Sequence, residues 1–252
     1  MIAVLETRDV RKVFTHKGRP DVVAVDGATL RIEAGECLGL VGESGSGKTT
    51  LARMALLLEK PTSGQVLLCG EDVTGVRGAQ ARRAWRRMQA VFQNPAGSFD
   101  PRCTLGAAIA EPLRTMGVPR REAQDRVAEL LGTCGLSPSL AERYPRQVSG
   151  GQCQRAAIAR ALAVGPDLLV CDEATSALDA TVQRQIVELL GRLRAELGMS
   201  MLFICHDIVL VGSICDRVAV MNRGAIVEQG PVAQVLEHPR HPYTKTLIDA
   251  VL

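Results

Sequence analysis

Residues 42–49 read Gly-Glu-Ser-Gly-Ser-Gly-Lys-Thr and have the spacing of a phosphate-binding loop. A triphosphate needs several backbone N–H donors converging on it, and glycines keep the backbone bare and permit unusual dihedral angles. The helix expected after the loop adds the positive end of its dipole. In this pattern Lys48 would reach the β- and γ-phosphates, and the Thr49 hydroxyl would bind Mg²⁺. The predicted nucleotide-binding residues are Gly42, Glu43, Ser44, Gly45, Ser46, Gly47, Lys48, Thr49 and Thr50.

An acidic pair follows the apolar run 168–171 and is the second candidate. In phosphate-loop enzymes a strand-end aspartate helps to hold Mg²⁺, so Asp172 is predicted to act there with Thr49. Glu173 would then polarise a water that attacks the γ-phosphate, a role that a kinase with a hydroxyl-bearing acceptor does not need. The alternative is that both acids only cap a loop, because acidic residues often end strands.

A second glycine-rich segment, Val148-Ser149-Gly150-Gly151-Gln152, precedes a helical run that reaches about residue 163. Ser149 is a natural N-cap, and the two glycines expose the backbone at a helix N-terminus. The sequence therefore encodes two anion-binding elements about 100 residues apart. Two such elements in one short chain make sense if they hold the same phosphate in different ways.

The order of these motifs resembles that of ABC ATPases over essentially the whole chain. Gln93 follows the run 88–92, the glycine-rich segment matches the family's signature with Val148 in place of leucine, and His206 follows the run 201–205. Ser176-Ala177-Leu178-Asp179 stands after the acidic pair, as in the family. The resemblance implies a head-to-tail pair of nucleotide-binding domains, with each ATP held between the phosphate loop of one subunit and the signature of the other.

Roles for individual residues follow from this resemblance. The implied catalytic residues are Lys48, Gln93, Glu173 as general base, and His206, which would position the water. The implied Mg²⁺ ligands are Thr49, Gln93 and Asp172, and ATP and Mg²⁺ are the implied cofactors. The further implied ATP contacts are Phe14, which would stack on adenine, Ser149, Gly150, Gly151, Gln152 and Asp179. Phe14 could instead be a core residue of a strand, and Asp179 also suits the N-cap of the helix that follows it.

Apolar runs alternate with helical patterns along the chain, which predicts an α/β fold. Strands are expected near 36–41, 65–69, 88–92, 168–171 and 201–205, with a hairpin over 218–228 turned at 222–224. Helices are expected over 48–58, 105–113, 118–135 and 152–163, and another from Asp179 that stops at Gly198. At most one helix is expected after Pro231.

One nucleotide-binding domain is expected to fill residues 1–252. Its fold class would be α/β: a P-loop NTPase (RecA-like) core over about 1–95 and 161–230, with the family's antiparallel β-subdomain. A helical subdomain would be inserted at about 96–160, and a C-terminal extension would cover 231–252.

Composition excludes several other classes. No run of eighteen apolar residues occurs, and charged residues at 6, 8 and 9 interrupt any leader-like segment, so we expect neither a membrane span nor a signal peptide. The net charge of +3 and the 3% of aromatic residues argue against nucleic acid as a partner. The nearest thing to a basic patch is the set of arginines at 82, 83, 86 and 87, which we interpret as the solvated face of a helix. Eight cysteines without metal-ligand spacing indicate a reducing cytosol.

The segments 94–113 and 238–244 resemble the oligopeptide, dipeptide and nickel importer branch of the family. This implies an ATP-hydrolysing subunit that energises import of peptides, nickel or metal-chelator complexes from the cytoplasmic face of the membrane. The implied partners are a second ATPase subunit, unlike or identical, two transmembrane permease subunits and an extracytoplasmic solute-binding protein. The alternatives are an exporter ATPase, a mechanical switch acting on DNA or ribosomes, and a metabolic kinase. Ala174 stands where the importer branch usually has proline. No cysteine follows Cys215 in this sequence, so the C-terminal iron–sulfur cluster of some dipeptide-system relatives is not expected.

Overall fold

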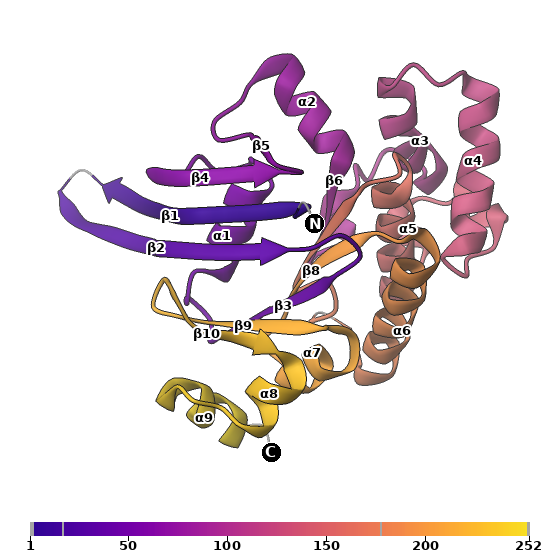
Figure 1. Ribbon diagram of the computed structural model, residues 1–252. Coiled ribbons are helices and arrows are strands. Elements are labelled where there is room, and N and C mark those ends of the chain that lie inside the picture. The colour runs from indigo at the N-terminus through magenta and orange to yellow at the C-terminus, as the bar shows by residue number, and fades with distance from the viewer. Residues whose placement is uncertain (1–2, 17, 177, 251–252) are drawn as a thin grey trace.

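The fold is built on a six-stranded sheet, seen edge-on in the middle of Figure 1. The computed structural model describes residues 3–16, 18–176 and 178–250. The strand order is β10-β9-β3-β8-β7-β6, and every neighbouring pair is parallel except β9 and β10, which form an antiparallel hairpin. The strands are β3 Cys37–Val41, β6 Met88–Phe92, β7 Leu168–Asp172, β8 Ser200–Ile204, β9 Arg217–Asn222 and β10 Ala225–Pro231.

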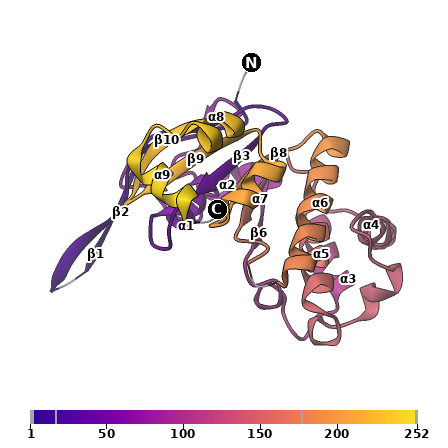
Figure 2. The ribbon, with the colours of Figure 1, turned by 90° about the horizontal axis from the view of Figure 1, so that it is seen from below.

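A separate antiparallel sheet has the order β2-β1-β4-β5. Its strands are β1 Leu5–His16, β2 Arg19–Ile32, β4 Ser63–Leu68 and β5 Glu71–Asp72. The long β1 and β2 strands reach out to the left of the molecule in Figure 1, away from the helices α3 and α4. Figure 2 shows the same arm and the same helices at opposite ends of the molecule.

Helices cover the parallel sheet and extend to the right of it in Figure 1. Three short 3₁₀ turns, η1 Ala96–Ser98, η2 Pro138–Glu142 and η3 Pro145–Gln147, lie between the longer helices. The α-helices are α1 Lys48–Ala55, α2 Gly78–Arg87, α3 Leu105–Thr115, α4 Arg120–Thr133, α5 Gly150–Leu162, α6 Ala180–Leu197, α7 Ile208–Ile214, α8 Val232–Glu237 and α9 Pro242–Asp249.

The central parallel strands β3, β7 and β8 are almost entirely apolar because both of their faces are buried. Leu38 and Val170 point into an apolar cluster shared with α1 and the antiparallel sheet. Their neighbours Cys37 and Leu169 point into a second cluster, which α5, α6 and α7 share with α3 and α4. A central strand covered on both sides has no solvated face, so it shows no alternation of polar residues. The α/β fold class predicted from the sequence is therefore confirmed.

Helix ends follow the predicted capping residues in three places. The side chains of Ser149 and Asp179 accept hydrogen bonds from the N–H groups of Gln152 and Val182, at 3.2 and 3.0 Å, as N-caps of α5 and α6. Gly198 ends α6 in a left-handed conformation with φ of 64°. These contacts are local, which is why sequence alone could predict them.

Two of the predicted helices differ from the structure. The first helix was expected to reach residue 58, but α1 ends at Ala55 because Leu57 has a left-handed φ of 58°. The expectation of at most one helix after Pro231 is wrong, because α8 and α9 both form there. His241 caps α9 with its imidazole and Pro242 occupies the first turn, which are local start signals of this helix.

Three observations bear on the expectations drawn from composition: helix hydropathy, the arginines of α2 and the state of the cysteines. Among the described residues, no helix is both long and apolar enough to cross a bilayer. Arg82, Arg83 and Arg86 are exposed on α2, which confirms the solvated helix face. All eight cysteines are free thiols, and burial raises the pKa of Cys134 to about 12.

Candidate functional site

The candidate residues gather where four parallel strands end together. Leu40 of β3 is opposite Ile204 of β8, Ile204 is opposite Asp172 of β7, and Asp172 is opposite Phe92 of β6. The residues that follow these strand ends are Gly42, Glu173, Gln93 and His206. The carboxyl edge of such a sheet is where ligands bind in open α/β folds. Four separate motifs of the sequence therefore meet at one edge.

The loop 42–47 leads from β3 into α1 and wraps around the Lys48 side chain. The Lys48 ammonium donates hydrogen bonds to the carbonyl oxygens of Gly42 and Glu43, both at 2.8 Å. Burial lowers the pKa of Lys48, while the nearby carboxylates of Glu173 and Asp172 oppose that shift. The first N–H groups of α1 have no partner within their own helix and are free to bind an anion.

Two loop glycines are required by packing as well as by the phosphate. A Cβ on Gly42 would lie 2.1 Å from the Met221 carbonyl oxygen, and one on Gly47 would lie 2.3 Å from that of Ala24. Gly45 differs, because a Cβ there would meet no described atom within 4 Å, although its φ is +80°. Gly45 is therefore the glycine whose backbone faces open space, as a phosphate cradle requires.

Thr49 and Asp172 supply the oxygen atoms that suit Mg²⁺. The Thr49 hydroxyl lies 3.4 Å from an Asp172 carboxylate oxygen. Burial, followed by the neighbouring charge of Glu173, raises the pKa of Asp172. A divalent cation beside this crowded acidic pair would relieve both effects, and Mg²⁺ commonly takes only one or two protein oxygens in addition to phosphates. The residues present therefore fit the implied metal.

Glu173 has an unusual backbone conformation. Its φ is 49°, in the left-handed region that residues other than glycine rarely adopt. Its N–H donates to the Ile204 carbonyl at 3.0 Å, and its carbonyl accepts bonds from the N–H and hydroxyl of Ser176. These bonds hold a turn that redirects the chain directly after β7. Backbone strain of this kind concentrates at functional sites, where it aims a side chain.

Gln93 and His206 are both exposed at the same edge of the sheet. Phe14 lies on β1 and pairs with Val22 of β2. Two residues further along β2, the carbonyl of Ala24 lies close to Gly47 of the loop. The Lys12 ammonium lies 5.0 Å from the centre of the Phe14 ring. The half-buried ring of Phe14 is thus near the loop without being part of the main core.

The signature segment 148–152 lies elsewhere in the molecule. Ser149 and Gln152 bond reciprocally, with the Ser149 N–H donating to the Gln152 side chain at 3.0 Å. The helix α5 that follows packs on the opposite face of the parallel sheet from α1 (Figures 1 and 2). Among the described residues, no hydrogen bond joins the signature to the phosphate loop. The exposed Ser149 and Gly150 are instead available to another molecule. In the motif 176–179, Ala177 is outside the described residues.

Sequence reasoning missed one contact to the loop. The Glu43 N–H donates to the hydroxyl of Tyr243, 3.0 Å away, across 200 residues of sequence. The tail 238–244 had been noted only for its resemblance to one importer branch. No local signal could have linked it to the loop, because the contact depends on how α9 packs.

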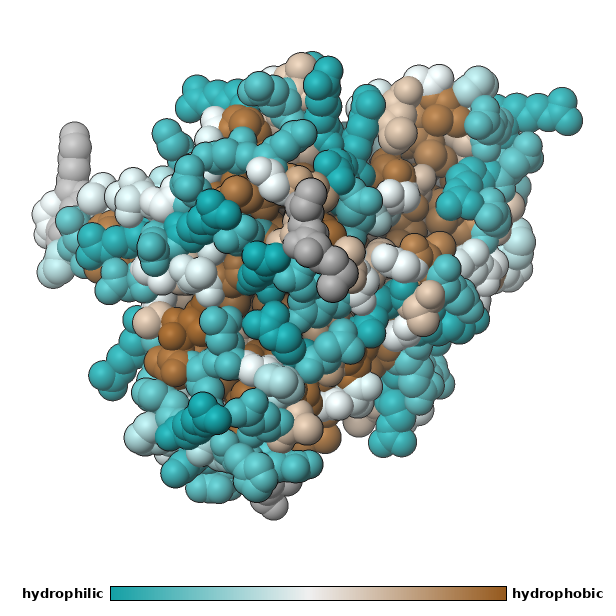
Figure 3. All heavy atoms as spheres, in the orientation of Figure 1, coloured by the Kyte–Doolittle hydropathy of each residue, from teal (hydrophilic) through white to brown (hydrophobic). Residues whose placement is uncertain are grey.

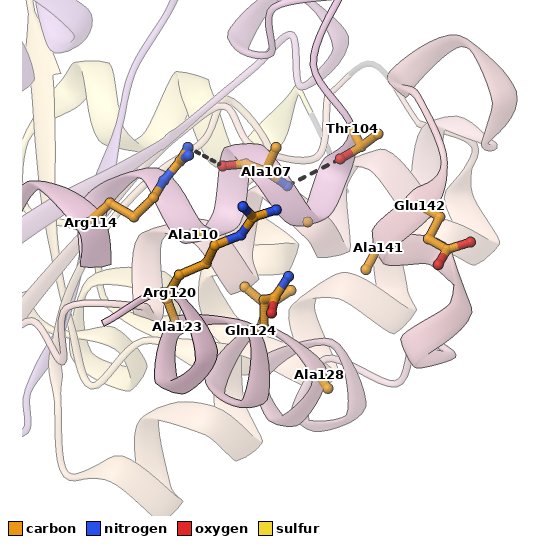
Figure 4. A pocket seen from close by; sticks show the side chains of 12 residues that line it. Thr104, Ala107, Ala110, Arg114, Arg120, Ala123, Gln124, Ala128, Ala141 and Glu142 are labelled. Carbon is orange, nitrogen blue, oxygen red and sulfur yellow. Dashed lines mark hydrogen bonds between the residues drawn. The ribbon is translucent and has the colours of Figure 1, made fainter. Parts of the chain in front are cut away.

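A hollow lies away from these residues, between α3 and α4 (Figure 4). Its volume is about 640 Å³, and small side chains such as Ala107 and Ala123 line much of it. Arg114, which bonds the Ala107 carbonyl at 3.1 Å, and Arg120 project over it. None of the predicted site residues lines this hollow.

Comparison with known proteins gives two family matches. Residues 25–176 match the family model described as ABC transporter. Residues 227–252 match the model described as the C-terminal region of oligopeptide/dipeptide transporters. The first match includes the phosphate loop, Gln93, the signature segment and the acidic pair. The second includes β10 from residue 227 onward, α8 and α9.

Individual proteins resemble the chain closely. The oligopeptide transport ATP-binding protein OppF of Salmonella typhimurium is 49% identical over 230 residues, which cover 90% of this chain and 69% of OppF. The oligopeptide transport ATP-binding protein AppF of Bacillus subtilis is 43% identical over 98% of this chain and 78% of AppF. A dimeric ATP-binding cassette solved in a post-hydrolysis state with ADP and Pi superposes with a TM-score of 0.81 at 29% identity, over 90% of this chain and 98% of that one.

Proposed function

Since the chain belongs to the ABC transporter ATP-binding family, we propose that it is the ATP-hydrolysing subunit of a peptide importer. The observation that carries this proposal is the pairing, in one chain, of a complete phosphate-loop site with the 227–252 match. Relatives named for oligopeptide transport support peptides over the nickel and metal-chelator complexes that the sequence left open. Other relatives, named for peptide import and glutathione import, support import over the exporter and mechanical-switch alternatives.

The geometry supports a specific division of roles at the strand edge. Lys48 and the loop N–H groups would bind the phosphates, and Glu173 would take a proton from the attacking water. Mg²⁺, when bound by Thr49 and Asp172 with Gln93 nearby, would neutralise charge that develops on the phosphates. His206, exposed at the end of β8, would orient the water. The fixed backbone turn at Glu173 supports this assignment, because it holds the base in position before ATP arrives.

A second ATPase subunit would complete the site. The signature helix α5 packs on the opposite face of the sheet from α1, and the exposed residues Ser149 and Gly150 at its start would offer backbone N–H groups to a partner's ATP. We propose that Ser149, Gly150, Gly151 and Gln152 contact the nucleotide of the opposite subunit, while Asp179 lies at the interface. The related cassette solved as a dimer supports pairing, and the partner is proposed to be an unlike subunit, with an identical one as the alternative.

The helical part would couple the site to the membrane. We propose a helical subdomain over about 96–160, which takes its position from the segment after Gln93. The Arg160 guanidinium donates to the Ser98 carbonyl at 2.6 Å and lies 4.5 Å from the centre of the Phe99 ring. These contacts tie α5, which begins at the signature, to the chain that leaves the nucleotide edge. A movement of the chain at Gln93 would therefore be transmitted to α5, the helix that begins at the signature.

The proposed docking site for a permease helix is the groove between α2 and α3, which apolar and charged side chains line together. Two adjoining hollows of about 420 and 320 Å³ share Trp85, Gln89, Glu111 and Pro112 in their walls. Large apolar side chains are exposed along them, and Figure 3 shows hydrophobic residues on this side of the molecule, over α3. These side chains are Leu58, Trp85, Phe92 and Met116. Two permease subunits would place the chain at the cytoplasmic face of the membrane, below an extracytoplasmic solute-binding protein.

Met116→Glu tests this groove. The substitution should abolish co-purification with the permease, because it places a charge on an apolar docking surface. The ATPase rate of the isolated subunit should stay within about twofold of the parent rate, because a change at an exposed surface position usually alters stability little. Leu197→Glu is the matched control, since Leu197 is also exposed but lies at the end of α6. Normal permease binding by Met116→Glu would contradict the assignment.

The function as a whole is tested by reconstitution. The chain, its partner ATPase and the permease are assembled in vesicles with the solute-binding protein, and ATP hydrolysis is measured with added oligopeptide, Ni²⁺ or a metal–chelator complex. Stimulation by oligopeptide alone is the expected result. Stimulation only by Ni²⁺ or a chelate would refute the peptide assignment, and hydrolysis without any permease dependence would refute the transport role.

A further inference from the structure

Tyr243 of helix α9 contacts the phosphate loop. The Tyr243 hydroxyl accepts the Glu43 N–H at 3.0 Å, while the tyrosine ring is half-buried against the large apolar cluster. On the same helix, Thr244 and Ile248 are buried. Packing therefore fixes where the hydroxyl lies, and the hydrogen bond is not a chance contact of a mobile side chain.

The hydrogen bond acts on a peptide group that Lys48 also holds. The Glu43 N–H and the Gly42 carbonyl belong to one planar unit, so they cannot turn independently. The Lys48 ammonium donates to that carbonyl at 2.8 Å, and Tyr243 accepts from the N–H on the other side. Gly42, with φ of 152°, offers little steric resistance to rotation of this unit. Tyr243 and Lys48 together therefore fix an orientation that the backbone alone would leave free.

The start of α9 is itself anchored to the sheet. The two carboxylate oxygens of Glu228, on β10, accept the backbone N–H groups of Arg240 and His241 at 2.9 and 3.0 Å. Partial burial opposes ionisation, but the Thr244 hydroxyl, followed by these two N–H donors, lowers the pKa of Glu228. His241 then caps the helix by accepting the Tyr243 N–H at 3.2 Å. A continuous set of contacts thus runs from β10 to the loop.

We infer that Tyr243 is a positioning residue of the ATP site and that α9, anchored by Glu228, braces the phosphate loop. The brace keeps the Gly42 carbonyl directed at Lys48, so that the ammonium is preorganised where the phosphates bind. This inference rests on the proposed ATP site. It gives the C-terminal region at 227–252 a local physical task, since that region contains both Glu228 and Tyr243.

Tyr243→Phe tests the brace with the smallest change, because it removes the hydroxyl and keeps the ring. Losing one hydrogen bond that orders the loop should weaken equilibrium ATP binding by about threefold to tenfold. The maximal turnover should change by less than about twofold, because bound phosphates restore the loop and only KM rises. Thr246→Val is the matched control, since it removes a hydroxyl from the same helix that bonds only the Pro242 carbonyl.

Two further measurements separate a positioning role from a general structural one. Glu228→Ala should weaken ATP binding to a similar degree, and the double variant should be no worse than either single one, because both changes release the same contact. In the parent protein the amide of Glu43, an exposed residue, should exchange with solvent slowly, and in Tyr243→Phe it should exchange faster.

The inference is overturned if Tyr243→Phe binds ATP as tightly as the parent, or if the Glu43 amide of the parent exchanges at the rate of an open loop. The second measurement needs no variant, so it decides the matter even if a substitution impairs folding. A parent protein that fails to bind ATP would refute the proposed function instead, while hydrogen exchange would still report on the brace.

Discussion

Glu173→Gln is expected to bind ATP as the parent does and to hydrolyse it at least about a hundredfold more slowly. The amide keeps the size and shape of the carboxylate but cannot accept a proton from water. The left-handed backbone and the bond from the Glu173 N–H to the Ile204 carbonyl should hold the new side chain in the same place. A lower rate of ATP hydrolysis would then reflect the loss of the general base and not a displacement of the loop.

The comparison that makes this result meaningful is Glu188→Gln. Glu188 is an exposed acid on α6, so the same substitution there should leave hydrolysis unchanged. ATP affinity is measured by equilibrium titration and turnover by phosphate release. Near-normal turnover in Glu173→Gln would show that Glu173 is not the general base. His206 or an acidic residue of the partner subunit would then be the candidate for that role.

Lys48→Ala is the second substitution for which we expect a large effect. It should weaken ATP binding itself by at least about tenfold, whereas Glu173→Gln should change only turnover. The Lys48 side chain is 4% exposed, and its ammonium is held by two carbonyl oxygens at 2.8 Å. Hydrogen bonds from a charged donor to phosphate are about twice as strong as neutral ones, and alanine removes them all. Hydrolysis measured at a fixed, modest ATP concentration should fall with the affinity.

Lys60→Ala is the control for the loss of positive charge, because Lys60 is exposed and lies outside the loop. Thermal unfolding of both variants shows whether the loop change has spread to the fold. An unchanged ATP affinity in Lys48→Ala would contradict the assignment of 42–49 as the phosphate cradle. Together the two site variants separate binding from chemistry: one should lose affinity, and the other should lose only turnover.

The parts of the site that sequence predicted well are those set by local physics. The loop 42–49 has backbone conformations that few residues other than glycine adopt, so its composition predicted its unusual turn. Ser149 and Asp179 cap helices through bonds that span three residues, and Gly198 stops α6 by its own conformation. The strands β3, β7 and β8 were found because apolar runs between turn signals mark buried strands.

Other parts could not be predicted because they depend on distant segments. The order β10-β9-β3-β8-β7-β6 decides that Gly42, Glu173 and Gln93 end at one edge, and no local pattern specifies that order. At most one helix was expected in the C-terminal tail, and the short α8 has no side-chain cap that would mark its start. The left-handed turn at Glu173 results from its bond to Ile204 on a neighbouring strand, so it is not visible in residues 172 and 173 alone.

The sequence by itself determined which groups can hold a phosphate, a magnesium ion and a water, because those tasks restrict residue type and spacing within a few positions. Only the tertiary structure decided that the signature helix packs on the opposite face of the sheet from α1 and that Tyr243 braces the loop from 200 residues away. The physical reason is that burial of the two apolar clusters on opposite faces of the sheet fixes these long-range positions, and burial is a property of the whole chain.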